Sequence, residues 1–127
     1  MDELQKLFTQ ARTGTLPPDF DRWEISDDSG RTVAHEAAYY GHLPPDFDRW
    51  DILDAHDWTV ARVAACRGHL PPDFEEWGIA NDYGWTVAHE ASYRGHLPPD
   101  FDRWTLATNN GITVRDVYNN WGTPRNE

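Results

Sequence analysis

A unit of 27 residues repeats along most of this 127-residue chain. The pentapeptide Leu-Pro-Pro-Asp-Phe begins four times at that interval, and a Trp follows each of its leucines by seven residues. A fixed period between about 20 and 50 residues indicates a stack of similar units, none of which can bury its apolar face alone. The leucines are Leu16, Leu43, Leu70 and Leu97, and the tryptophans are Trp23, Trp50, Trp77 and Trp104.

Each unit is predicted to contain two short helices. In the unit 30–56, Thr32 is a suitable N-cap for a first helix with Val and Ala at helical spacing, and Gly41 is suited to end it. A second helix is expected to begin near Pro45, because each Pro disfavours helix in the residue before it. Polar loops connect the units. Asp57 replaces the Gly of the other loops, and Asp tolerates the left-handed region better than most residues.

We therefore expect one all-α domain over residues 1–127, with three full repeats between two caps. The N-terminal cap has apolar residues at helical spacing, and the C-terminal cap is predicted to keep one helix over 113–120. The boundaries are 1–29 for the N-terminal cap, 30–56, 57–83 and 84–110 for the repeats, and 111–127 for the C-terminal cap.

The block Gly-x-Thr-Val-Ala-His-Glu-Ala-x-x-x-Gly-His-Leu resembles the ankyrin repeat, whose hallmark is Thr-Pro-Leu-His-x-Ala in units of about 33 residues. The matching positions are Thr32, His35, Ala37, Gly41 and His42, then Thr86, His89, Ala91, Gly95 and His96. Arg62 replaces the His in the second repeat, and the period and the Pro-Pro segment depart from the family. The resemblance implies an ankyrin-like helix-pair solenoid that binds proteins through loop tips and the inner helix face. A different helix-pair solenoid is the alternative.

The chain lacks a constellation of residues suited to metal binding or catalysis. Five of the six His follow the repeat and only His56 lies outside it; no two are spaced as His-x-x-x-His. Cys66 has no second thiol beside it, and carboxylate pairs such as Asp46 and Asp48 recur from unit to unit, as structural residues do. We therefore expect no catalytic residues, no metal and no cofactor, and a protein that is not an enzyme.

A partner should contact the positions where the repeats differ. Trp58 and Trp85 precede the capping Thr, where Arg31 is also accepted, so the repeat itself does not require an aromatic there. Tyr, Trp and Arg are enriched at protein interfaces. The predicted partner-binding residues are Arg31, Tyr39, Tyr40, Asp57, Trp58, Arg67, Tyr83, Trp85, Tyr93 and Arg94. Packing of Trp58 and Trp85 across adjacent repeats is the alternative.

The charge of the chain suggests a second function. Its 22 acids and 11 bases give a net charge of −11, with residues 1–29 at −4 and residues 111–127 at zero. Such a chain is poorly suited to direct nucleic-acid binding, which needs clustered Lys and Arg. The alternative is an acidic inhibitor that mimics nucleic-acid charge and blocks a basic nucleic-acid-binding protein. A viral or phage-borne origin would suit it, and its contacts would be Asp27, Asp28, Asp54 and Asp57.

The remaining expectations concern location and assembly. The chain has one Cys, no basic and apolar start typical of a signal peptide, and no apolar run near the roughly 20 residues that a membrane helix needs. Seven Trp argue against disorder, and the irregular second repeat argues against a strict consensus design. We expect a cytoplasmic monomer that binds another protein, basic in the inhibitor alternative, and no membrane.

Overall fold

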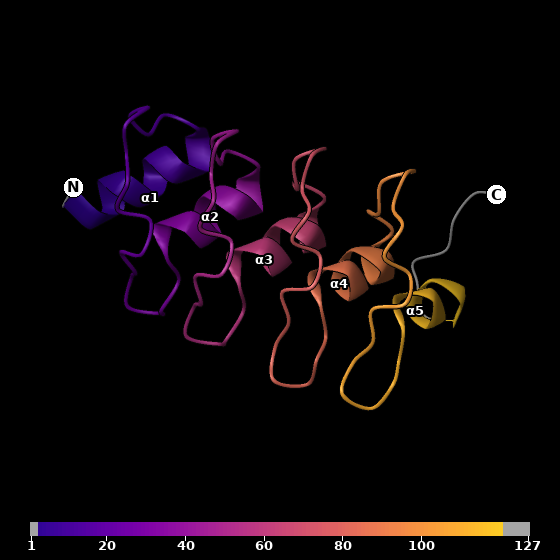
Figure 1. The fold of residues 1–127 in the computed structure, drawn as a ribbon. Helices are drawn as coiled ribbons and strands as arrows, with labels where there is room; N and C mark the ends of the chain where they lie inside the picture. The colour runs from indigo at the N-terminus through magenta and orange to yellow at the C-terminus, as the bar shows by residue number, and fades with distance from the viewer. Residues whose placement is uncertain (1–2, 121–127) are drawn as a thin grey trace.

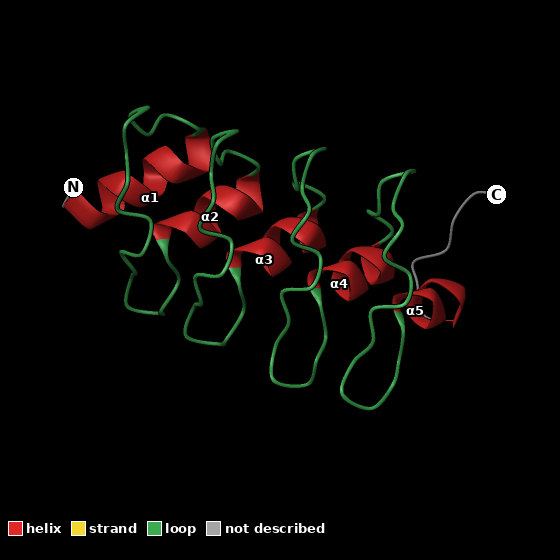
Figure 2. Cartoon of the chain, in the orientation of Figure 1, coloured by secondary structure: helices red, strands yellow, loops and turns green. Residues whose placement is uncertain are grey.

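Five helices form a single row in the computed structural model, which describes residues 3–120 (Figure 1). Each helix packs against the next along the chain, from α1 at one end to α5 at the other. The described residues form helices joined by loops, with no strands (Figure 2), so the all-α prediction is confirmed for them. The helices are α1 (Glu3–Thr13), α2 (Val33–Tyr40), α3 (Val60–Arg67), α4 (Val87–Arg94) and α5 (Val114–Asn120). Of the predicted C-terminal cap, residues 121–127 lie outside the described part.

The ends of the repeat helices follow from local sequence. The Thr32 hydroxyl accepts a hydrogen bond from the His35 backbone N–H at 3.0 Å, which satisfies one free amide of the first turn of α2. Gly41 ends α2 with φ at 82°, a left-handed conformation that costs Gly little. The same caps bound α3 and α4, so both cap predictions are confirmed. The equivalent residues are Thr59 with Gly68 and Thr86 with Gly95.

The predicted second helix of each repeat is wrong. The segment after Pro45 forms two turns instead, in which the Phe47 N–H donates to the Pro44 carbonyl at 3.1 Å and the Ile52 N–H donates to the Arg49 carbonyl at 3.3 Å. Two adjacent prolines supply no N–H, and no Ser or Thr cap precedes the segment as Thr32 precedes α2. A helix this short is unfavourable without such support. Each described repeat thus has one helix rather than a pair.

The turns of the Leu-Pro-Pro segments hold a continuous ladder of aromatic rings. Trp50 contacts Phe47 of its own repeat and Phe74 of the next, with centroids 5.0 and 5.2 Å apart and rings nearly perpendicular. Edge-to-face contacts of this kind favour aromatic pairs beyond the area that they bury. The common register of the four tryptophans predicts that all are core residues. Trp23, Trp50 and Trp77 are buried, whereas Trp104 at the end of the ladder is half-buried. The ladder joins every described repeat to the next.

A hairpin-like loop precedes each helix from α2 to α5. One antiparallel bridge closes each loop, for example between Ser26 and Thr32. We call these loops hairpins 1 to 4, and they span residues 26–32, 53–59, 80–86 and 107–113. All four project to the same side of the row of helices (Figure 1). They therefore place the residues that differ most between repeats along one edge of the molecule.

Buried histidines connect some neighbouring repeats. The Nε2 of His89 lies 2.8 Å from the carbonyl of Ile112 in the next repeat, and its Nδ1 accepts from the Thr86 backbone N–H at 3.2 Å. Nε2–H must therefore be the donor, which assigns a neutral ring. His35 makes the same contact with Trp58, at 2.7 Å. Burial lowers the pKa of both residues below 6.5.

This burial predicts a protein that loses stability in mild acid. Because the folded-state pKa of His35 and His89 lies below the unfolded value of 6.5, the unfolded chain binds more protons as the pH falls past that value. The free energy of unfolding should be greatest above pH 6.5 and decline toward pH 5. Urea titrations at several pH values measure it. A His35→Gln/His89→Gln variant should show a smaller decline, and an unchanged decline would refute the assignment.

Candidate functional site

Four of the predicted partner-binding residues line one shallow groove at the base of hairpins 2 and 3. Trp58, Trp85, Tyr93 and Arg94 are brought together there, in a groove of about 230 Å³. Trp58 and Trp85 are both half-buried. Trp58 packs against the core, whereas the Trp85 ring lies 5.1 Å from that of His89 and 6.4 Å from that of Tyr93. The half-burial is compatible with packing across adjacent repeats, and partner binding by these two residues stays a prediction. Arg62 and Glu90 complete the groove, which we call the Trp groove.

A buried carboxylate organises the Trp groove. Glu90 is 2% exposed and accepts hydrogen bonds from Arg62 Nε at 3.2 Å, Arg94 Nε at 3.0 Å and Trp85 Nε1 at 2.8 Å. The hydrogen bond to Glu90 raises the pKa of Arg94. The Arg62 guanidinium also lies 3.7 Å from the centre of the Trp58 ring, within cation–π range. These contacts fix the orientation of both Trp side chains.

A second carboxylate clamp lies at the N-terminal end. Glu36, 4% exposed, accepts from Arg12 Nε at 2.9 Å and from Arg31 Nη1 at 2.7 Å. The hydrogen bond to Glu36 raises the pKa of Arg12. Val63 occupies the equivalent position in the second repeat. Sequence reasoning missed both clamps, although Glu36 and Glu90 recur in phase on the buried face of a helix.

Another group of predicted residues clusters between α2 and α3, apart from the Trp groove. The Arg67 guanidinium lies 4.3 Å from the centre of the Tyr39 ring. The guanidinium of Arg31, which belongs to the same repeat as Tyr39, lies 5.3 Å from that ring. The ring of Tyr40 is 5.0 Å from that of Tyr39. The structure therefore divides eight of the ten predicted residues between two aromatic clusters.

The two remaining predicted residues are at hairpin tips. Asp57 is exposed with φ at 65°, so the expected left-handed turn forms without Gly. Tyr83 is 78% exposed and lines no groove with the tryptophans. Both are accessible to a partner, but neither belongs to the Trp groove.

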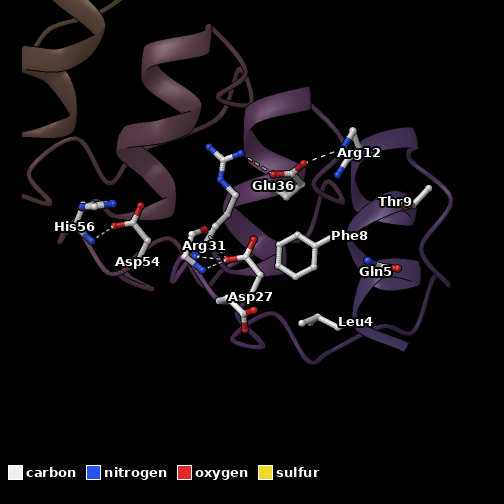
Figure 3. A pocket seen from close by; sticks show the side chains of 12 residues that line it. Leu4, Gln5, Phe8, Thr9, Arg12, Asp27, Arg31, Glu36, Asp54 and His56 are labelled. Atoms are coloured by element: carbon white, nitrogen blue, oxygen red, sulfur yellow. Dashed lines mark hydrogen bonds and ion pairs between the residues drawn. The ribbon is translucent and has the colours of Figure 1, made fainter. Parts of the chain in front are cut away.

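A larger groove of about 920 Å³ lies between α1, α2 and hairpins 1 and 2 (Figure 3). It collects Asp27, Asp28 and Asp54, three of the four acids predicted for an inhibitor, whereas Asp57 lies outside it. Leu4 and Phe8 of α1 supply apolar surface. We call it the N-terminal groove.

Two of these acids also shape their hairpins. Asp27 Oδ1 accepts from the backbone N–H groups of Ser29 and Arg31, both at 3.0 Å. Partial burial alone would raise the pKa of Asp27, but hydrogen bonds from Ser29 and Arg31 outweigh it and lower that pKa. Asp54 caps hairpin 2 in the same way, and Asn81 does so in hairpin 3. An amide oxygen can therefore replace the carboxylate in this structural role.

The described residues show little that suggests chemistry. Burial raises the pKa of the half-buried Cys66 thiol, which disfavours the reactive thiolate. Within residues 3–120, no three His, Cys, Asp or Glu side chains gather as metal ligands would, and no helix is long and apolar enough to cross a membrane. Comparison with known protein families and with curated proteins finds no match.

Proposed function

We propose that this protein is a non-catalytic binding module that recognises another protein through its hairpins and adjoining helix faces. The observation that supports this most is the Trp groove, where Trp58, Trp85 and Tyr93 gather with two arginines on the face that differs between repeats. Trp, Tyr and Arg supply most of the binding free energy at protein interfaces. The rings are held in place by the Glu90 clamp, so little side-chain entropy remains to be lost on binding.

We further propose an ankyrin-like solenoid whose unit is shortened to 27 residues. The capped helix, the Gly that ends it and the hairpin between units support this assignment. The chain departs from the ankyrin repeat in the second helix of the unit, because two turns stand in its place. Shorter units leave the aromatic ladder to make the contacts that a second helix would make.

The test removes the two tryptophans without disturbing the fold. Trp58→Ile introduces the residue found at the equivalent position of hairpin 4, Ile112. Trp85→Arg introduces the residue found in hairpin 1, Arg31. Arg31 bonds to Glu36 in the same way that Trp85 bonds to Glu90. We expect the double variant to keep its circular dichroism and melting temperature. Its affinity for the partner should fall about 30-fold or more, as for an interface anchor.

Partners would come from a displayed library of protein fragments of the source organism, selected against the immobilised native protein. Isothermal titration would then compare the native protein, the double variant and a Leu53→Ser control. Leu53 is 53% exposed but outside the Trp groove, and hairpin 1 has Ser26 in its place. A double variant that binds the selected fragments as tightly as the native protein would contradict the proposed surface.

The acidic inhibitor remains a second candidate, because Asp27, Asp28 and Asp54 share the N-terminal groove. This function predicts selected partners that are basic nucleic-acid-binding proteins and whose binding weakens strongly with salt. Binding that is equally tight at low and moderate ionic strength would exclude it.

A further inference from the structure

The junction between the second and third repeats differs from its neighbours. Hairpins 1 and 2 are joined by a hydrogen bond from the Ala55 N–H to the Gly30 carbonyl at 3.1 Å, and hairpins 3 and 4 by one from the Asn109 N–H to the Tyr83 carbonyl at 3.0 Å. Over residues 3–120, no backbone hydrogen bond joins hairpins 2 and 3. The row of hairpins therefore lacks a backbone hydrogen bond at its central junction.

Two substitutions within the repeat explain the difference. A Cβ at Gly84 would lie 2.6 Å from the Asn109 nitrogen, so close approach of successive hairpins needs Gly at this position. Asp57 is the equivalent residue of hairpin 2 and has a side chain. Arg62 replaces the His that elsewhere bonds to the next repeat, and its guanidinium turns to Glu90. The backbone bond between hairpins and the His contact are thus both absent at this junction, where the Arg62–Glu90 ion pair joins the two repeats instead.

The Trp groove lies at this junction and suits an apolar group. Its charged members, Arg62, Glu90 and Arg94, are already paired with one another, and the Trp85 Nε1–H is bonded to Glu90. What remains for a ligand is mainly ring surface. At about 230 Å³ the groove is smaller than a typical small-molecule site of about 300–1,000 Å³. It matches one large side chain of a partner.

Negative charge lies directly beside the Trp groove. Asp54 lines the N-terminal groove and Trp58 lines the Trp groove. A hydrogen bond of 3.0 Å from the Trp58 N–H to Asp54 Oδ1 joins the two residues. Arg12 and Arg31 are bound to Glu36, and the described ion pairs include none with Asp27, Asp28 or Asp54. These acids are therefore available to basic side chains of a partner.

We propose that the partner presents an extended segment with one large apolar side chain in the Trp groove and Lys or Arg side chains beside it, over the N-terminal groove. This inference rests on the protein-binding function proposed above and specifies the chemistry of the partner. The apolar anchor supplies most of the affinity, and the charges set direction and register.

A random 16-residue peptide library, displayed and selected against the native protein, tests this chemistry. The enriched peptides should share an aromatic or large aliphatic residue with Lys or Arg on one side of it. Peptides that bind without basic residues would overturn this inference and leave the binding function intact. Failure of the random peptides, with success of the fragment library, would also overturn it. Failure of both libraries would contradict the binding function itself.

A charge variant of the native fold then locates the basic side chains. The variant replaces Asp27, Asp28 and Asp54 by Asn. Other repeats already have Asn at these positions: Asn81 is equivalent to Asp27 and Asp54, and Asn109 is equivalent to Asp28. The triple variant should bind the selected peptides about tenfold more weakly at low salt, and nearly normally at high salt. The matched control, Asp73→Asn/Asp100→Asn/Asp102→Asn, removes equal charge from the Leu-Pro-Pro segments. Equal weakening by the control would refute the proposed location.

Discussion

Replacing Trp77 by Ala should lower the free energy of unfolding by about 3–5 kcal/mol, the range for truncation of a buried aromatic side chain. Trp77 is 8% exposed and contacts Phe74 at 5.0 Å and Phe101 at 5.2 Å. The variant therefore loses two edge-to-face contacts as well as buried area, and it interrupts the aromatic ladder between Phe74 and Phe101. Urea unfolding followed by circular dichroism measures the loss.

Trp104→Ala is the matched control. Trp104 has the same register but is half-buried, and no Phe of a following repeat stacks on it within residues 3–120. Its other aromatic and cation–π contacts there are with Tyr118, which is exposed, and with the Arg115 guanidinium. Its truncation should cost clearly less than that of Trp77. Equal losses, or a Trp77→Ala protein as stable as the native one, would mean that the ladder does not stabilise the stack.

Gly30→Ala should be nearly as harmful, with an expected loss of about 2–5 kcal/mol. Gly30 has φ at 84°, a conformation that strains any residue with a Cβ. The added Cβ would also overlap the Cβ of Ala55 in hairpin 2, so the two hairpins must separate and lose the hydrogen bond between them. Equilibrium unfolding in urea gives the loss.

Gly111→Ala separates the two causes. Gly111 has an equivalent φ of 87°, but a Cβ there would meet none of the described residues within 4 Å. It should therefore cost only the backbone strain, about 1–2 kcal/mol. Similar losses for Gly30→Ala and Gly111→Ala would show that contact between hairpins 1 and 2 contributes little.

Features set by neighbouring residues could be predicted from the sequence. The Thr32 cap and the Gly41 end of α2 depend on atoms within one turn, and the structure confirms both. The left-handed turn at Asp57 was predictable for the same reason. In-phase repetition also indicated that the four tryptophans of the repeat are core residues, which is confirmed for Trp23, Trp50 and Trp77 but not for the half-buried Trp104.

Features set by distant residues could not be predicted. The missing cap of the Leu-Pro-Pro segment is a local feature, but the contacts that its turns make join rings 24 residues apart, such as Trp50 and Phe74. Glu90 recurs visibly, but its partner Arg62 lies 28 residues earlier and at a position where other repeats have His. Pairing over that distance depends on how the repeats stack, which no local pattern encodes.

The aromatic ladder has a consequence for how such a chain evolves. Each Phe–Trp step within a repeat, and each Trp–Phe step between repeats, has nearly the same geometry at every position from Trp23 to Phe101. If one whole 27-residue unit were duplicated or deleted, each Trp would still meet the Phe of the following unit, and the ladder would stay continuous. The proposed binding residues Trp58 and Trp85 could then diverge on the opposite edge while the ladder accommodated changes in the number of units.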